Sequence, residues 1–400
     1  MNSTGNFDNL VQDFDLNQFL TQNKHLDAES YLLRHKGNTN QLNWLLAEQL
    51  KIYPKASYKL PEFVKHHCWF TSKSYEQSSS ESSAIFKCKR FSGQTLLDLS
   101  GGLGVDDWAF SRTFKQIISL DPNAELNQLV RINNQKLGIK NIQRIDTKAE
   151  DYMPEALNRF FDLVYLDADR RPDEKRAWFL EQVQPNYLEL ASPLNKISKE
   201  ILLKVSPMVD LTYLKESIQH LKEIWVLGDS KEVKEVLVLI EPNYEGSVRT
   251  EAIELKTNGE FDSFLYEPKQ EEPSTNPVQA NYFFEPHPVI IKAGLSKIYA
   301  RSIGLNQIAP ESAFYLGANL PNSFMGRAFR ILAKEDFSKA TLKEYLKRNK
   351  LTQANVTRRN FILSTDDIRK QFKLKDGGDE YLFFTEDATG KRIFIHAQKP

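Results

Sequence analysis

The residues best suited to chemistry lie in one short segment, which reads Leu96-Leu-Asp98-Leu-Ser100-Gly101-Gly102-Leu-Gly104-Val. Its apolar run predicts a strand that ends near Asp98, followed by a Gly-rich turn and a helix that begins near Val105. Glycine has no Cβ, so such a turn lets the backbone approach a ligand closely at the carboxyl end of the first strand. A tight strand-to-helix turn that binds nothing is the alternative that this segment alone leaves open.

An acid, Asp121, follows the next predicted strand, 23 residues after Asp98. A carboxylate at that place can bind the two hydroxyls of a ribose, and nicotinamide-binding proteins also have one there. Two features distinguish this loop from theirs. It reads D-x-S-G-G-x-G rather than G-x-G-x-x-G, and an acid precedes its first glycine. A carboxylate that faces the loop repels a pyrophosphate but suits a cationic amino-acid group. The pattern therefore indicates S-adenosylmethionine, whose ammonium and sulfonium groups are positive.

A further acid, Asp167, ends the fourth predicted strand, in the run Phe161-Asp-Leu-Val-Tyr-Leu-Asp167-Ala168-Asp169-Arg170-Arg171. If the strands are parallel, this end lies near the reactive methyl group of the cofactor. A carboxylate or carbonyl there can hold an amino group or accept its proton. A polar strand end with surface ion pairs is the alternative. Together with the Gly-rich loop, the pattern favours a functional role.

The elements that must position these residues are short apolar runs that alternate with stretches of helical spacing. Seven such runs occupy residues 95–99, 116–120, 142–145, 162–166, 201–205, 224–227 and 236–240. Strands that alternate with helices predict an α/β fold with a mostly parallel sheet covered on both faces. Seven strands complete a Rossmann-like, doubly wound domain, which we expect at residues 91–255. The last two runs are close together and predict an antiparallel pair at one edge.

The regions on either side of this domain have different sequence patterns. Residues 1–90 are predicted to be helical, and the Ser-rich stretch at 78–83 is either a helix N-cap or a polar linker. Beyond the central domain, the spacing predicts one helix over 290–303 and another around 342–346. Strands are predicted at 361–363, 381–384 and 392–395. The C-terminal part is therefore expected to be a small α+β module.

Residues 95–240 resemble the class I S-adenosylmethionine-dependent methyltransferases. Asp98 to Gly104 resembles their first motif, and Asp121 their ribose-binding acid. The run Asp167-Ala-Asp-Arg170 resembles the D-P-P-R form of their fourth motif, found in enzymes that methylate RNA bases, but Ala168 and Asp169 replace the prolines. The whole chain is similar to a little-characterised bacterial group with a ferredoxin-like segment, here 279–330, and a C-terminal THUMP-like domain, here 331–400. The stretches that carry this likeness are Asp98–Asp106, 204–210, 282–286, 292–294 and 375–378.

The resemblance implies a role for each matching residue. Cofactor binding would fall to Asp98, Ser100, Gly101, Gly102, Gly104 and Asp121, with Glu150 as a candidate for the adenine. Asp167, helped by Arg170, would orient the acceptor. Residues 1–90 would form a helical cap over the substrate face. THUMP-like domains resemble RNA-binding appendages, so the candidate RNA contacts are Lys343, Lys347, Arg348, Lys350, Arg358 and Arg359. A solvated helix face is the alternative for these basic residues.

The favoured function is methyl transfer from S-adenosylmethionine to a base nitrogen of RNA. Three alternatives stay open: an RNA-binding protein with an inactive methyltransferase domain, a methyltransferase that acts on protein or a small molecule, and a nucleotide-dependent oxidoreductase. The loop sequence argues against the last of these.

Composition narrows the setting of this chain of 400 residues. Only Cys68 and Cys88 are present, the N-terminus lacks a signal pattern, and the seven histidines have no metal-binding spacing. We therefore expect a cytoplasmic protein without a metal or a membrane span. Its 53 basic and 53 acidic residues balance. That balance hides a net −7 over residues 241–285 and a net +7 over residues 331–375, so it does not exclude a nucleic-acid partner.

Overall fold

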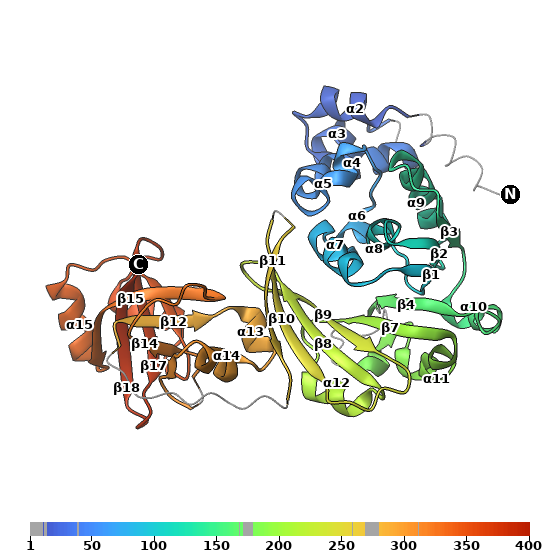
Figure 1. The fold of residues 1–400 in the computed structure, drawn as a ribbon. Helices are drawn as coiled ribbons and strands as arrows, with labels where there is room; N and C mark the ends of the chain where they lie inside the picture. Colours follow the sequence, from blue (N-terminus) through green and yellow to red (C-terminus); the bar gives the residue numbers. More distant parts are fainter. Residues whose placement is uncertain are drawn as a thin grey trace. The chain divides into compact units, whose positions relative to one another are not determined.

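The computed structural model describes residues 11, 14–37, 40–167, 169–170, 179–257, 259–268, 280–310 and 312–400, with the backbone alone for 169 and 170. Two compact units make up the chain (Figure 1). The first comprises Met1–Ile224, Glu235–Val248 and Leu255–Glu260, and the second comprises Trp225–Lys234, Arg249–Glu254 and Phe261–Pro400.

The N-terminal region is helical where it is described, as predicted. Its helices are α2 (Leu16–Asn23), α3 (Ala28–Arg34), α4 (Gln41–Lys59), α5 (Pro61–Lys65), α6 (Ser72–Gln77) and α7 (Glu81–Arg90). Polar residues begin most of them, because a side-chain oxygen there accepts a bond from an otherwise unpaired backbone N–H. The Ser80 side chain does this for Ser83 N, so the Ser-rich stretch contains the N-cap of α7.

The central sheet contains all seven predicted strands. They are β1 (Gly93–Asp98), β2 (Phe114–Leu120), β3 (Ile142–Ile145), β4 (Phe161–Asp167), β7 (Ser198–Val205), β8 (Leu221–Gly228) and β9 (Val233–Ile240). The strand order is β11-β10-β8-β9-β7-β4-β1-β2-β3. Neighbours from β3 to β7 pair in parallel, and β9 runs antiparallel to β7.

The predicted edge of this sheet is wrong. Two further strands, β10 (Arg249–Leu255) and β11 (Phe261–Tyr266), follow β8 in the strand order, so β8 and β9 do not form the edge. Strand β10 was not predicted, because its sequence is Arg-Thr-Glu-Ala-Ile-Glu-Leu. It carries polar residues at positions where buried strands usually carry apolar ones.

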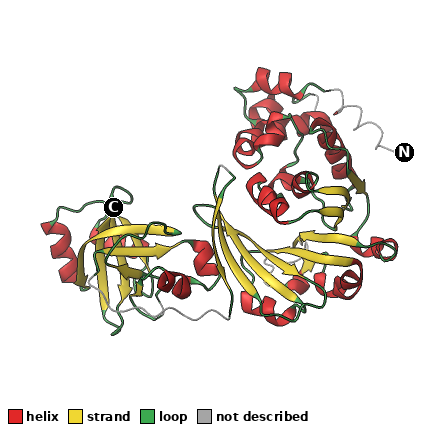
Figure 2. Ribbon diagram, viewed as in Figure 1, coloured by secondary structure: helices red, strands yellow, loops and turns green. Residues whose placement is uncertain are grey.

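Helices alternate with the strands of the first unit (Figure 2). They are α8 (Val105–Phe110), α9 (Ala124–Lys136), α10 (Ala149–Ala156), α11 (Tyr187–Ile197) and α12 (Leu211–Ser217). A short 3-10 helix, η1 (Leu180–Gln182), precedes β6 (Val183–Gln184), which pairs with β5 (Asp169–Arg170). Because β1, β2, β4 and β7 are parallel, their carboxyl ends meet at one edge of the sheet.

The second unit contains a seven-stranded sheet in the order β13-β14-β12-β15-β18-β17-β16. Its strands are β12 (Tyr282–Pro286), β13 (Asn306–Gln307), β14 (Tyr315–Gly317), β15 (Gly326–Asp336), β16 (Asn355–Arg358), β17 (Glu380–Glu386) and β18 (Arg392–Gln398). Its helices are α13 (Pro288–Lys292), α14 (Ser296–Ser302), α15 (Lys339–Arg348) and α16 (Thr365–Phe372). Strand β12 pairs with β15, so the segment expected at 279–330 shares one sheet with the module that follows it.

Two predicted elements of this unit are wrong. The helix expected over 290–303 is divided into α13 and α14, with Gly294 at φ +72° between them. The strand expected at 361–363 is not formed. Instead, β16 lies just before it, and the Phe361 ring packs into an aromatic core beside Phe337 and Phe384. No helix in the described part of the chain is long and apolar enough to cross a bilayer.

Candidate functional site

The Gly-rich loop lies at the carboxyl end of β1, as expected. Leu99 N donates to Tyr165 O of β4 at 3.0 Å, and Gly101 N donates to Leu120 O of β2 at 2.8 Å. These two bonds fix the loop between the neighbouring strands. Gly102 and Gly104 have φ angles of +47° and +78°, in the left-handed region that favours glycine.

Arg144, a buried residue of β3, holds the loop in place through hydrogen bonds. Its Nη2 donates to Gly102 O at 2.8 Å, its Nη1 to Asp107 Oδ2 at 3.1 Å, and its Nε to Asn127 Oδ1 at 2.9 Å. A Cβ on Gly101 would lie 2.2 Å from Arg144 Nη1, so Gly101 is required by this packing. A Cβ on Gly102 would meet nothing nearer than an oxygen at 3.7 Å, so a ligand has room beside that residue.

Asp98 and Asp107 form a buried carboxyl pair under the loop. Asp98 is 1% exposed, and its Oδ1 accepts bonds from Ser100 N at 2.8 Å and Ser100 Oγ at 3.0 Å. Burial and the nearby Asp107 raise the pKa of Asp98 well above its usual value. Burial also raises the pKa of Asp107, against the opposing effect of Arg144.

Of the other two expected cofactor residues, Asp121 is bonded to this loop and Glu150 is not. Asp121, directly after β2, accepts a bond from Gly102 N on Oδ2 at 3.0 Å and one from Asn123 N on Oδ1 at 2.8 Å. The structure therefore brings Asp98, Ser100, the three glycines and Asp121 together. Glu150 lies in the first turn of α10. Within the described part of the chain, no hydrogen bond or ion pair joins its side chain to the loop.

Asp167, the last residue of β4, adjoins the loop through Ser100. Asp167 N donates to Ser100 Oγ at 2.6 Å, and Asp167 Oδ2 is 2.6 Å from the Nζ of Lys204 near the end of β7. Burial raises the pKa of Asp167, although Lys204 acts to lower it. The side chain is still 26% exposed, so it can meet a substrate. The Arg170 backbone lies in β5, but its side chain is outside the described residues, as are Ala168 and Arg171.

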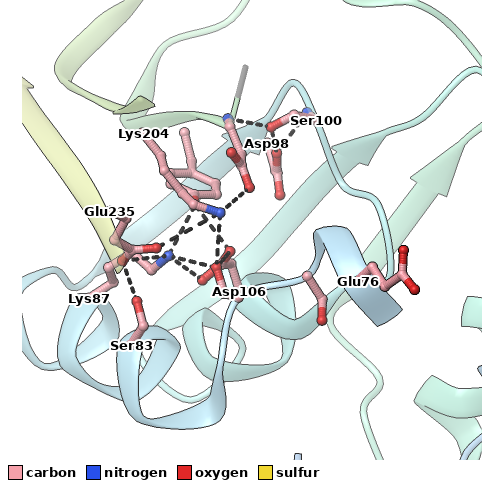
Figure 3. A network of polar contacts seen from close by, with 12 residues as sticks. Glu76, Ser83, Lys87, Asp98, Ser100, Asp106, Lys204 and Glu235 are labelled. Atoms are coloured by element: carbon pink, nitrogen blue, oxygen red, sulfur yellow. Dashed lines mark hydrogen bonds and ion pairs between the residues drawn. The ribbon is translucent and has the colours of Figure 1, made fainter. Parts of the chain in front are cut away.

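A network of charged side chains in the first unit joins Lys204, Glu235, Lys87 and Asp106 (Figure 3). Lys204 Nζ lies 3.8 Å from Glu235 Oε2, and Glu235 Oε1 lies 3.6 Å from Lys87 Nζ. Lys87 is fully buried and pairs with Asp106 Oδ1 at 2.7 Å. Tyr165 and Ser79 both donate to Asp106 Oδ2, at 3.0 and 2.8 Å. No group of three or more His, Cys, Asp or Glu side chains among the described residues could hold a metal ion.

Sequence reasoning missed this network and Arg144. A signal was available, because Lys204 interrupts the apolar run Ile201-Leu-Leu-Lys204-Val and Glu235 precedes another. A charge within a strand that is buried on both faces requires a partner, since an unpaired buried charge is costly. That signal says a partner exists but does not identify it.

The expected RNA contacts in the second unit fall into two groups. Lys343, Lys347 and Arg348 on α15, and Lys350 after it, are exposed. Among them Arg348 pairs with Glu335 at 3.0 Å. Arg358 Nη1 donates to Phe361 O at 3.0 Å, and Arg359 pairs with Glu285 at 3.2 Å. The three arginines are therefore engaged in contacts within the protein, whereas Lys343, Lys347 and Lys350 make no ion pair within the described part of the chain.

The chain is similar to several known proteins. Residues 326–399 match the family model described as THUMP domain-like. The chain is 22% identical over 338 residues to an uncharacterized S-adenosylmethionine-dependent methyltransferase of Mycobacterium tuberculosis, covering 82% of this chain and 87% of that one. The crystal structure of a proposed methyltransferase from Porphyromonas gingivalis W83 is 28% identical, with a TM-score of 0.81. That match covers 96% of this chain and 99% of the other.

The fold and the loop also fit S-adenosylmethionine, independently of the comparisons. The loop offers the Asp121 carboxyl group after β2, the buried Asp98 carboxyl group at the end of β1, and no atom within 3.7 Å of a Cβ on Gly102, an arrangement that suits a ligand with a ribose. The comparisons and the fold together identify an S-adenosylmethionine-dependent methyltransferase. The chain ends in a THUMP-like domain, so it resembles the bacterial group with that combination of parts.

Proposed function

We propose that this methyltransferase transfers a methyl group to a base nitrogen of RNA in the cytoplasm. The observation that carries the proposal is the position of Asp167. Its backbone N bonds to Ser100 Oγ at 2.6 Å, so a carboxylate able to orient an acceptor adjoins the cofactor loop. The THUMP-like domain and the exposed lysines of α15 support RNA as the substrate.

The loop residues would hold the cofactor. Asp98 and Ser100, with Gly101, Gly102 and Gly104, would bind its methionine part, and Asp121 would bind the ribose hydroxyls. Glu150 stays the candidate for the adenine. Bound S-adenosylmethionine supplies a methyl group on a positively charged sulfur.

Asp167 would orient the acceptor and receive its proton. Its carboxylate accepts an N–H of the base, which directs the nitrogen lone pair toward the cofactor. Lys204 holds the carboxylate in place through Oδ2 and favours its ionised form. Arg170 would assist from the neighbouring segment. Catalysis then comes mainly from positioning.

The direct test is incubation of the whole protein with methyl-labelled S-adenosylmethionine and total RNA, followed by digestion to nucleosides. We expect label in one modified base, and a loss of about a hundredfold in rate for D167A. If protein or small molecules became labelled and RNA did not, the substrate would be one of those and not RNA. RNA binding without any transfer would favour the inactive RNA-binding alternative. Tight binding of NAD, with no binding of S-adenosylhomocysteine in calorimetry, would contradict the cofactor assignment.

A further inference from the structure

Helix α4 has an exposed face that the proposed reaction does not use. Trp44, Lys51, Lys55 and Tyr58 lie on it, because steps of seven, eleven and fourteen residues return to nearly the same side of an α-helix. We call these four residues the α4 stripe. Trp44 is 56% exposed and Tyr58 is 91% exposed, whereas Leu45, Leu46 and Leu50 of the same helix are buried. The stripe is therefore not part of the core.

A groove of about 310 Å³ runs beside the stripe. Lys51, Lys55 and Lys59 of α4 line it, together with Tyr75 and Glu76 of α6. Lys59 Nζ is held by Tyr75 O at 2.7 Å and lies 4.8 Å from the centre of the Tyr75 ring. Lys51 and Lys55 make no ion pair within the described part of the chain. Three lysines and one glutamate line the groove, so its net charge suits an anion.

The groove is connected to the candidate site by a short piece of chain. Glu76 is three residues before Ser79, a separation of at most about 11 Å. Ser79 Oγ bonds to Asp106 at 2.8 Å and to Lys87 at 3.0 Å, within the network that reaches Asp167. Figure 3 draws Glu76 with no dashed line to this network.

The composition of the stripe identifies the ligand chemistry. Exposed Trp and Tyr rings are stacking surfaces for unpaired bases, and lysines next to them neutralise the backbone phosphates. A purely electrostatic surface would not need the aromatic rings, and a purely apolar contact would not need the lysines. Single-stranded nucleic acid requires both.

We propose that the α4 stripe and its groove bind a single-stranded segment of the RNA substrate. Lys51 and Lys55 contact phosphates, and Trp44 and Tyr58 stack on bases. This inference rests on the proposed function and adds an RNA surface in the first unit. It is separate from the basic residues of the C-terminal module.

The test compares two double variants of the full chain with a matched control. K51A/K55A removes the expected phosphate contacts, and W44A/Y58A removes the expected stacking contacts. The control, K196A/K199A, removes two exposed lysines at the end of α11 and the start of β7. Binding of a fluorescent oligouridine is measured by anisotropy at several salt concentrations. We expect each α4 variant to weaken binding by about tenfold. K51A/K55A should also lower the salt slope by about 1.4, while the control stays like the parent.

Methyl transfer to total RNA separates this inference from the function on which it rests. A rise in KM for RNA in both α4 variants, with kcat kept, supports the inference. Parental binding and KM in both variants would overturn it while leaving the function intact. Oligouridine binding that depends on α4, in a protein that never methylates RNA, would remove the function but keep the surface. If polyglutamate bound as tightly as oligouridine and W44A/Y58A had no effect, the surface would be one for an acidic protein.

Discussion

At the scale of single residues, Lys204 sets the charge of Asp167. Its Nζ lies 2.6 Å from Asp167 Oδ2, and it acts to lower the pKa of that carboxyl against the effect of burial. Asp106 acts in the opposite direction, and Lys87 assists Lys204. Removing the ammonium in K204M leaves the carboxylate less stable, so its pKa rises. We expect the acid limb of the pH profile for kcat to move up by about one to two pH units.

The control is K204R, which keeps the positive charge and should keep the limb near its parental position. Calorimetry with S-adenosylhomocysteine should give the parental affinity for both variants, since Lys204 does not belong to the loop. A K204M profile that overlies the parental one would remove Lys204 from the mechanism.

Gly101 is constrained by Arg144 rather than by its own φ angle. The Cβ of G101A would lie 2.2 Å from Arg144 Nη1 and 2.3 Å from Ser119 Oγ, so the loop or the arginine must shift. We expect a loss of about 2 kcal/mol in stability and at least about a tenfold loss in S-adenosylhomocysteine affinity. Thermal melting and calorimetry measure the two effects. G37A, where a Cβ meets nothing within 4 Å, is the matched control and should change neither.

At the scale of elements, one buried carboxyl couples two helices. Glu81, the first residue of α7, accepts bonds on Oε1 from Glu62 N at 2.7 Å and Phe63 N at 3.3 Å, at the start of α5. Burial raises the pKa of Glu81 from 4.5 to about 7. Because the folded state binds the proton more tightly, this stabilisation is complete below pH 4.5 and is lost as the pH rises through about 7.

The E81Q variant removes this titration while keeping an oxygen acceptor. We expect the parent to melt at a lower temperature at pH 8 than at pH 5.5, because Glu81 contributes about 2 kcal/mol less to the stability at pH 8. E81Q should show a smaller difference between the two pH values. An equal pH dependence in parent and variant would show that Glu81 ionises normally.

The elements that could be predicted are those with a strong local signal. The apolar runs at 95–99 and 162–166 predicted β1 and β4, because a parallel strand is buried on both faces. Strand β10 carries Thr250, Glu251 and Glu254 in buried positions, so its sequence does not look like a strand. Phe361 looks like a strand residue but packs into the core from a turn.

The candidate site divides in the same way. Asp98, Asp121 and Asp167 could be found because each directly follows or ends an apolar run, and parallel strands bring such ends together. Lys87, Lys204 and Glu235 could not be grouped, because their contacts join α7, β7 and β9 across the fold. The spacing of these residues along the chain does not predict those contacts. They exist only after the strands have taken their order in the sheet.

At the scale of the whole molecule, the zero net charge is a cancellation between segments. Residues 331–375 carry twelve basic and five acidic residues, whereas residues 241–285 carry three basic and ten acidic ones. A polyanion responds to local charge over about one Debye length, roughly 10 Å, so the balance of the whole chain does not decide its binding. RNA should therefore bind to particular surfaces rather than to the protein in general.

The variant K343A/K347A/K350A tests this for the C-terminal module. These three lysines are exposed on and after α15, and Arg348 is left in place because it pairs with Glu335. Losing three phosphate contacts should lower the salt slope of RNA binding by about two and raise the KM for RNA several-fold. The kcat and the affinity for S-adenosylhomocysteine should not change, because neither depends on this module. K115A/K196A/K199A, which removes three exposed lysines of the first unit, is the matched control. A fall in kcat with KM unchanged would mean that the module acts on the fold of the enzyme and not on RNA.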